Sequence, residues 1–252
     1  MRLLAIPFVS FLGLSACDPA LLIGKADDVD APEISCATRP APGCNFDQSP
    51  LRVLPEPVEL PRRAYKFFPT ATRLSFVDSR NRVWVAPART LTDGASIPPI
   101  FTAIVGDPTS PEFINAAAVH DAYCGVGNEQ GDNFHNGRWQ DVHIMFYDGL
   151  VAGGTEPLRA KLMFAAVWLG GPRWQTSRDL THVPVTRKQQ AMKRAKAFVE
   201  TKTPTLPSLI EFLEILEREM LTEYPPERAR TEDNYYEPIS PGDTIQTTDP
   251  AI

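Results

Sequence analysis

The sequence lacks an excess of positive charge, any apolar run long enough to span a membrane and any internal repeat. Lys and Arg together number 25 against 31 Asp and Glu, so the net charge is −6 over 252 residues. A nucleic-acid-binding protein needs a basic face for the phosphates, and this balance argues against a nucleic-acid partner. Beyond the N-terminal segment, the longest apolar run is Leu162 to Leu169, far shorter than the roughly 20 residues of a membrane-spanning helix.

Cysteine is scarce, with 4 residues in the chain, and only two of them lie close together. Cys36 and Cys44 flank a short proline-containing stretch. In an oxidising compartment they are expected to close a small loop through a disulfide, which leaves Cys124 unpaired. The alternative is that all three of these cysteines are free thiols.

Hydrophobic residues make up 43% of the chain, which is typical of a globular protein once glycine is added. Proline is the exception, because its 25 residues are about twice the usual share. The prolines gather in the first 61 residues, where no hydrophobic periodicity is visible. This pattern predicts a flexible tether over residues 17–61, followed by one globular domain.

The N-terminal segment indicates export. Met1 and Arg2 precede an apolar run from Leu3 to Leu14, which is typical of a secretory signal. The sequence Leu-Ser-Ala-Cys that ends at Cys17 resembles the lipobox of bacterial lipoproteins. This resemblance implies removal of residues 1–16 and acylation of Cys17. The protein would then be anchored in the cell envelope, on either the inner or the outer membrane.

The remaining pattern predicts a mainly helical α+β fold, with a small N-terminal β-hairpin before a bundle of three or more helices. Alternating segments at 72–77 and 82–86 are joined by turn-forming residues. Helical periodicity or capping signals mark residues 110–124, 137–150, 155–170, 186–201 and a final helix capped by Ser208 and Glu211. We expect a core domain at 62–175, a helical extension at 176–222 and a disordered tail at 223–252. The basic stretch at 186–201 is either a solvated face or a contact for anionic lipid headgroups.

Three short segments concentrate residues that carry chemistry. They are Thr92–Pro98 (Thr-Asp-Gly-Ala-Ser-Ile-Pro), the pair His120 and Asp121, and Arg138–Asp141 at the start of the second predicted helix. In this order the segments resemble a bacterial and phage family known as domain of unknown function 1353, over about residues 65–175. That family brings no settled activity.

A looser resemblance suggests a mechanism. Asp-Gly-x-Ser, then His-Asp, then Arg-x-x-Asp is similar to the bacterial secreted phospholipases A2. The resemblance implies that His120 is a general base oriented by Asp141. It also implies that Asp93 and Asp121 bind Ca²⁺ and that the backbone N–H of Gly94 faces the oxyanion. The sequence departs from those enzymes because it lacks their bracing disulfides and their glycine-rich calcium loop.

Helical geometry is compatible with this assignment. Successive helical residues point about 100° apart, so His120 can face Asp141 while Asp121 turns toward Asp93. A carboxylate that holds one imidazole nitrogen leaves the other free to take a proton from water. A hard cation such as Ca²⁺ prefers oxygen ligands and polarises an ester carbonyl.

Several alternatives remain open for the same residues. His120 is also compatible with a core histidine that merely bonds Asp141. A zinc site from His120, Asp121, His135 and His143 is conceivable, although the spacings match no standard zinc motif and His135 and His143 are expected on the surface or in loops. Cys124 as a nucleophile is disfavoured because nothing in the sequence marks a low-pKa thiol.

Two functional hypotheses follow. The first is a lipid-anchored hydrolase that cleaves a phospholipid ester, with a cell-wall bond as the alternative substrate. The second is a non-catalytic envelope lipoprotein whose C-terminal helices bind a partner. The hydrolase predicts an open cleft over His120 and a cation between Asp93 and Asp121. The binding protein predicts that both aspartates are bonded to backbone N–H groups or arginines, without solvent access.

Overall fold

The computed structural model describes residues 34–38, 43–61, 63, 66–94, 97–105 and 111–226. Within these ranges the chain forms a mixed α+β fold of six α-helices and two small antiparallel sheets. The predicted signal peptide, the acylation site at Cys17 and most of the predicted tail lie outside the described residues.

Each sheet has three short strands, and both use residues from the segment predicted as a tether. The first sheet has the order β1 (Asn45–Phe46), β4 (Leu74–Val77), β5 (Val83–Ala86), and the second has the order β2 (Val58–Glu59), β3 (Lys66–Pro69), β6 (Leu91–Thr92). The strands are therefore more than one N-terminal hairpin, and residues 43–61 are not a free tether. A strand of two residues is too short to show an alternating pattern in the sequence. It is recognised only by its hydrogen bonds to a neighbouring strand.

The predicted hairpin between residues 72 and 86 is formed by β4 and β5. Leu74 pairs with Ala86 and Val77 with Val83 in an antiparallel register. The Asp78 carboxylate accepts hydrogen bonds of 2.8 Å from the backbone N–H groups of Arg80 and Arg82, which closes the turn. On β5, Trp84 and Ala86 are buried while Val83 is exposed, so alternate residues face the helices and the solvent.

The predicted helices are present with shifted ends. They are α2 (Pro111–Cys124), α3 (Trp139–Ala152), α4 (Pro157–Gly170), α5 (Val185–Lys202) and α6 (Leu206–Glu223). The short helix α1 (Thr102–Val105), which follows a 3₁₀ turn at Pro99–Phe101, was not predicted. The predicted Ser208–Glu211 capping box is wrong, because Thr205 caps α6 and its hydroxyl accepts from the Ser208 N–H at 3.3 Å. Similarly, Glu156 rather than Thr155 caps α4. Each helix has a proline in its first two positions, where a missing N–H breaks no helical hydrogen bond. As a result α4 begins after the predicted cap Thr155, and α6 begins before the predicted cap Ser208.

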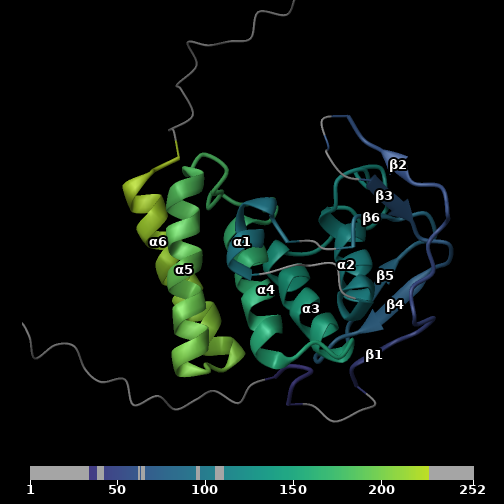
Figure 1. Ribbon diagram of the computed structural model, residues 1–252, viewed down its shortest axis with the longest axis horizontal. Helices are drawn as coiled ribbons and strands as arrows, with labels where there is room; N and C mark the ends of the chain where they lie inside the picture. Colours follow the sequence, from purple (N-terminus) through teal and green to yellow (C-terminus); the bar gives the residue numbers. More distant parts are fainter. Residues whose placement is uncertain are drawn as a thin grey trace, which may run out of the picture. The chain divides into compact units, whose positions relative to one another are not determined.

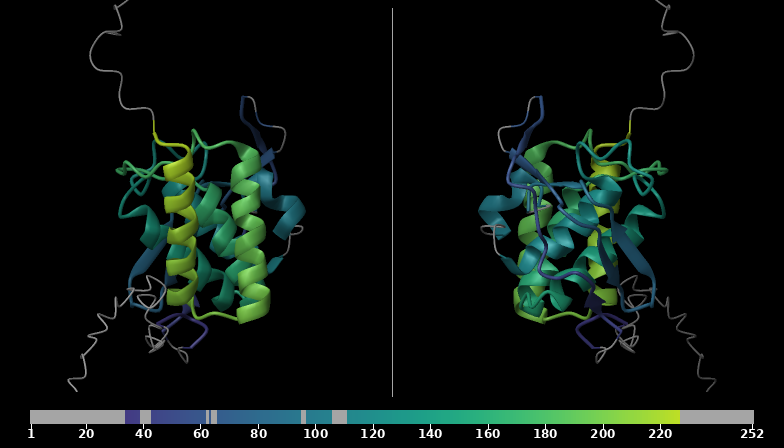
Figure 2. Two further views of the ribbon diagram at one scale, coloured as in Figure 1. Left: turned by 90° about the vertical axis from the view of Figure 1, so that its left-hand side faces the viewer. Right: turned by 90° about the vertical axis from the view of Figure 1, so that its right-hand side faces the viewer.

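The helices α2 to α6 follow one another in sequence order away from the sheets, and α1 lies between α4 and α5 (Figure 1). α2 packs against β5 and α3, α3 packs against α4, and α4 packs against the antiparallel pair α5 and α6. Figure 2 shows α5 and α6 running side by side over their whole length. Their inner faces bury Ala191, Ala195, Leu209 and Leu213 in the same hydrophobic core as α3 and α4. The C-terminal helices are therefore an integral part of this core.

The loop before the first strand is fixed to the helical layer. Cys36 and Cys44 are joined by a disulfide, with a sulfur–sulfur distance of 2.06 Å. The Asp148 carboxylate on α3 accepts hydrogen bonds from the backbone N–H of Cys36 at 2.8 Å and from that of Ser79 at 3.0 Å. One buried side chain thus connects the disulfide loop, the β4–β5 turn and α3.

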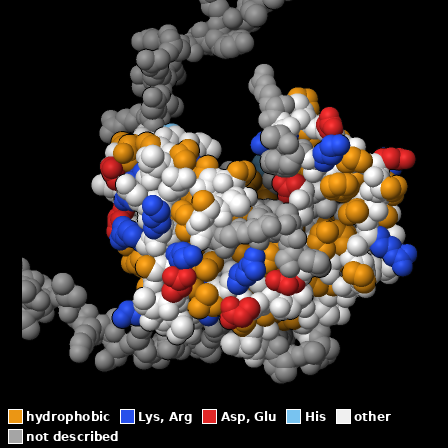
Figure 3. All heavy atoms as spheres, viewed as in Figure 1, with side chains coloured by type: hydrophobic (Ala, Val, Ile, Leu, Met, Phe, Trp, Pro, Cys, Tyr) orange, Lys and Arg blue, Asp and Glu red, His pale blue; other side chains and the backbone are white. Residues whose placement is uncertain are grey.

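Three of the six basic side chains of α5 (Arg187, Arg194 and Lys196) are paired with acidic side chains. Arg187 binds Glu223, with a nitrogen–oxygen distance of 2.6 Å, and Arg194 binds Glu219. Figure 3 shows blue and red side chains next to each other over this part of the molecule. This pairing favours the solvated-face interpretation of the stretch at 186–201. Among the described helices, none combines the length and apolarity that a membrane crossing requires.

Candidate metal centre

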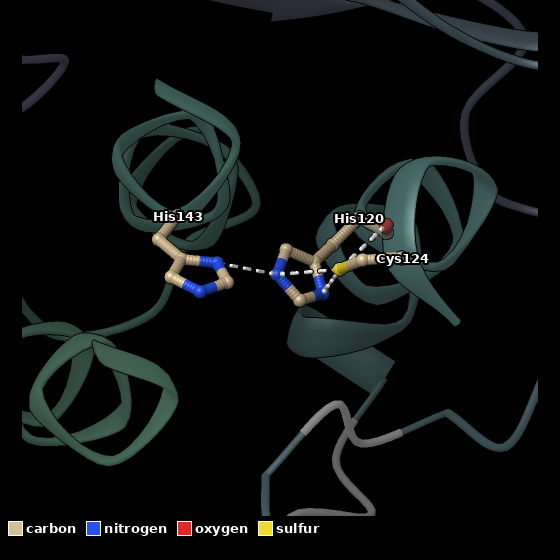
Figure 4. Close-up of side chains that lie close together, drawn as sticks. All are labelled: His120, Cys124 and His143. Carbon is tan, nitrogen blue, oxygen red and sulfur yellow. Dashed lines mark hydrogen bonds between the residues drawn. The ribbon is translucent and has the colours of Figure 1, made fainter. Parts of the chain in front are cut away.

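Two histidines and a cysteine meet between α2 and α3. His120 and Cys124 are one helical turn apart on α2, and His143 faces them from α3 (Figure 4). Nε2 of His120 lies 3.0 Å from Nδ1 of His143, and Sγ of Cys124 lies 3.4 Å from Nε2 of His120. One ligand atom from each residue lies within 4.8 Å of the other two.

Helical spacing and small side chains explain why these three side chains lie close together. Residues four apart share one face of a helix, so Cys124 lies one turn beyond His120 on the same side of α2. The two helices approach closely where Gly149 of α3 lies against Ala116 of α2. A Cβ atom at Gly149 would lie only 3.0 Å from the Cβ atom of Ala116. The absence of that carbon lets the side chains of the two helices reach each other.

All three side chains are almost completely buried, with exposed fractions of 2% for His120, 5% for Cys124 and 0% for His143. Burial lowers the pKa of His120 to about 3. Burial, with the nearby His120 and Arg173, lowers the pKa of His143 well below its usual value. Burial and the charge of Asp121 raise the pKa of the Cys124 thiol. Both imidazoles are therefore neutral near pH 7, which is the form that binds metals, and a thiolate at Cys124 requires a cation beside it.

Aromatic rings surround the cluster on its inner side. The Phe146 ring lies 5.0 Å from His120, and the Trp139 ring lies 5.5 Å edge-on to His143. His135 stacks almost parallel to Trp174 at 4.5 Å, and Trp174 in turn lies edge-on to His143 at 6.5 Å. These rings exclude water and hold the ligand side chains in place.

The other side of the cluster borders a pocket of about 190 Å³. His120, Cys124, Asp121 and Asp93 contribute to its lining. Much of the remaining wall is apolar and includes Phe67, Ile97, Pro98 and Val126. The pocket brings a small molecule or water next to His120 and Cys124, whereas His143 lies behind them and is not part of its lining.

The predicted His120–Asp141 dyad is wrong. The Asp141 carboxylate binds Arg138, with Nε 3.0 Å from Oδ2, and is also paired with Arg80 and Arg82 at 3.3 Å. The His120 imidazole instead contacts His143. Asp141 and His143 are two residues apart on one helix, so they point about 200° apart and cannot both face α2.

The other predicted residues have mixed outcomes. Asp93 and Asp121 both border the pocket, as a shared cation site would require. The oxyanion role of Gly94 is wrong, because its N–H donates to Thr92 Oγ1 at 3.1 Å. His143 was expected at the surface and is instead fully buried.

The sequence did contain one signal for the cluster. A histidine and a cysteine at positions i and i+4 on a predicted helix form a potential ligand pair. The third ligand was not recognisable, because nothing in the sequence tells which face of α3 turns toward α2. His135, the remaining member of the zinc alternative, stacks on Trp174.

Comparison with known proteins agrees with the first resemblance. A family described as protein of unknown function (DUF1353) matches residues 69–167. The uncharacterized protein y4iH of Sinorhizobium fredii is 41% identical over 99 residues, which cover 39% of this chain and 38% of the relative. The uncharacterized protein y4jT of the same strain is 34% identical over 107 residues, or 42% of this chain and 30% of the relative. No solved structure matches.

The chain thus matches less than two fifths of the length of either relative, and the names of both assign no activity. The family match includes the sequence positions of His120, Cys124 and His143. It ends before the segment that follows α4 and before α5 and α6.

Proposed function

We propose that the protein is a metal-dependent hydrolase that binds a Zn²⁺-type ion through His120, Cys124 and His143. One observation carries the proposal: two neutral imidazole nitrogens and one sulfur lie within 4.8 Å of one another beside a pocket. Imidazole and thiolate are the ligands that Zn²⁺ prefers, whereas Ca²⁺ prefers oxygen.

The distances support a tetrahedral ion. Zinc–nitrogen bonds of 2.0–2.1 Å and zinc–sulfur bonds of 2.3 Å give about 3.3 Å between two nitrogens and about 3.6 Å between nitrogen and sulfur. The corresponding separations are 3.0 Å between His120 and His143 and 3.4 Å between His120 and Cys124. These two separations would open by a few tenths of an ångström around an ion, and the ligand atoms of Cys124 and His143 lie within 4.8 Å of each other.

A centre with three protein ligands suits catalysis better than a structural role. Structural zinc sites have four protein ligands, whereas catalytic sites keep the fourth position for water. Within the described part of the chain, the cluster contains three histidine or cysteine ligands. We place water at the fourth position, on the pocket side, where the ion would lower its pKa to about 7. Asp121 borders the same pocket and would accept a proton from this water.

The substrate and location follow from the N-terminal resemblance and remain part of the proposal. A lipid anchor at Cys17 would hold the enzyme against a membrane of the cell envelope. A phospholipid ester is therefore the first substrate to test, and a cell-wall bond is the second. A Ca²⁺ ion between Asp93 and Asp121 is an additional proposal, supported by the position of both carboxylates at the pocket.

A non-catalytic role is the second candidate, and one contact favours it. The 3.0 Å separation of His120 Nε2 and His143 Nδ1 fits a direct hydrogen bond between two neutral imidazoles. In that case the pair stabilises the core without a metal, and the protein is an envelope lipoprotein that binds a partner.

Metal binding separates the two candidates. The full chain in detergent is dialysed against Zn²⁺ or Co²⁺, and bound metal is measured by elemental analysis. We expect one ion per chain, lost in His143→Ala and Cys124→Ala but retained in His182→Ala, whose imidazole is exposed and bonds the Tyr224 carbonyl. With Co²⁺, Cys124→Ser should remove the thiolate-to-metal charge-transfer band. A wild-type chain that binds no ion contradicts the metal centre and favours the structural pair.

Activity is tested on the metal-loaded chain with phospholipid vesicles and with peptidoglycan, each with and without a chelator. The proposal expects release of fatty acid or of cell-wall fragments that stops when the metal is removed. Metal-loaded protein that cleaves neither substrate contradicts the proposed hydrolysis of these two substrates.

A further inference from the structure

We infer that Glu217 of α6 is a positioning residue for the metal centre, which it influences by holding Arg173 and the segment that covers His143. This inference rests on the proposed metal centre. It assigns a role to the C-terminal helices, which lie beyond the part of the chain that the family match covers.

Arg173 and Glu217 form a buried ion pair. Nη1 of Arg173 lies 3.0 Å from Oε1 of Glu217, and the side chains are 2% and 0% exposed. Arg178, which is more exposed, places its Nε 2.6 Å from the same oxygen. Buried charges are unfavourable unless they are paired, so the loss of either partner leaves the other uncompensated. The Glu217 carboxylate on α6 therefore holds the Arg173 guanidinium at its buried position.

The guanidinium of Arg173 in turn contacts two backbone carbonyls and one aromatic ring. Its Nη2 donates to the Trp168 carbonyl at 2.7 Å and its Nη1 to the Arg178 carbonyl at 2.8 Å. Its central carbon lies 4.4 Å from the centre of the Trp139 ring, in a cation–π contact. The Trp139 ring is the one that lies edge-on to His143. A single indole thus separates the Arg173 guanidinium from a proposed metal ligand.

The residues on either side of Arg173 also reach the centre. Pro172 borders the pocket that His120 and Cys124 also line. The Trp174 indole donates to the Gly137 carbonyl at 2.8 Å and lies edge-on to His143. Displacement of Arg173 would therefore disturb His143 through Trp139 and Trp174, and the pocket beside His120 and Cys124 through Pro172.

Glu217 acts at a distance from the reacting atoms. Among the described residues, the pocket lining includes Pro172 but no member of α6. Its influence on the ion must pass through Arg173, which makes it a positioning residue. Loss of a direct partner of a metal ligand weakens metal affinity by about 10–100-fold, and a residue one step further away, such as Glu217, should have a smaller effect.

The test compares metal binding by four forms of the full chain: wild type, Glu217→Gln, the double variant Arg173→Met/Glu217→Leu, and Glu219→Gln. Glu219 is the matched control, because it is on the same helix and forms an exposed pair with Arg194. The double variant removes both charges, which avoids leaving a buried unpaired arginine and favours folding. Zn²⁺ affinity and the Co²⁺ absorption spectrum are measured, with circular dichroism as the check on folding.

We expect Glu217→Gln and the double variant to bind Zn²⁺ more weakly, by up to about 10-fold, and to show an altered Co²⁺ spectrum. Glu219→Gln should match wild type in both measurements. A folded double variant with wild-type affinity and spectrum overturns the inference, even if Glu217→Gln fails to fold. Absence of metal from the wild type itself contradicts the proposed function instead, so the two failures are distinguishable.

Discussion

Gly149 on α3 lies against Ala116 on α2, within the contact between the two helices that carry the cluster. A Cβ atom at Gly149 would be 3.0 Å from the Ala116 Cβ atom. Gly149→Val should therefore separate the helices, destabilise the fold by about 1–3 kcal/mol and weaken metal binding. Urea denaturation and Zn²⁺ titration measure the two effects. Gly149→Ala is the milder comparison, since its small overlap is opposed by a better helix propensity. Unchanged stability in the valine variant would contradict the close packing.

Metal removal should lower the thermal stability of the folded chain. A ligand at 100 times its dissociation constant stabilises the native state by about 2.7 kcal/mol. For a domain of this size, that corresponds to a rise in Tm of about 5–10 °C. Calorimetry with saturating Zn²⁺ and then with a chelator measures the difference. His143→Ala should show no metal-dependent shift, and an equal shift in that variant would mean that the ion binds elsewhere.

Asp141 should contribute to stability and not to catalysis. Burial opposes its ionisation, but the hydrogen bonds and charges of Arg138 and Arg82 outweigh burial and lower its pKa. Because the folded pKa is below the ordinary value of 3.8, this stabilisation is complete above that value and is lost as the pH falls through the folded pKa. Asp141→Asn should cost about 1 kcal/mol at neutral pH, the upper end of the range for surface ion pairs, because the carboxylate is mostly buried while its arginine partners are partly exposed.

Urea denaturation at neutral and at strongly acidic pH tests this assignment. The difference between wild type and Asp141→Asn should disappear in acid, where the carboxylate is protonated. Metal binding by the variant should equal that of the wild type. A selective loss of hydrolysis in Asp141→Asn, with stability unchanged, would restore a catalytic role for this residue.

Reduction of the Cys36–Cys44 disulfide should destabilise the protein. The bond joins residues separated by 8 positions, for which the chain-entropy model gives about 2.5 kcal/mol. Urea denaturation with and without a reductant measures this free energy. Cys124→Ser serves as the control, because it keeps the disulfide and should lose the same amount on reduction. A chain whose stability does not respond to the reductant would show that the loop is held mainly by Asp148.

The sequence predicted the helices well because each follows from local information. The apolar periodicity of residues 137–150 and 155–170 placed α3 and α4 to within two residues at each end. The turn chemistry at 78–81 likewise located the β4–β5 hairpin. The short strands β1 and β2 were not predictable, because their existence depends on pairing with β4 and β3.

By itself the sequence determined the order of the helices and the presence of His120 and Cys124 on one helical face, because a period of 3.6 residues is a local property. Which residue of α3 meets that face was decided only by the tertiary structure. Asp141 and His143 lie on opposite sides of α3, and the rotation of that helix depends on its packing against α2, including the contact between Ala116 and Gly149. A local pattern carries no information about this rotation, and so the sequence suggested a carboxylate partner where the fold supplies an imidazole.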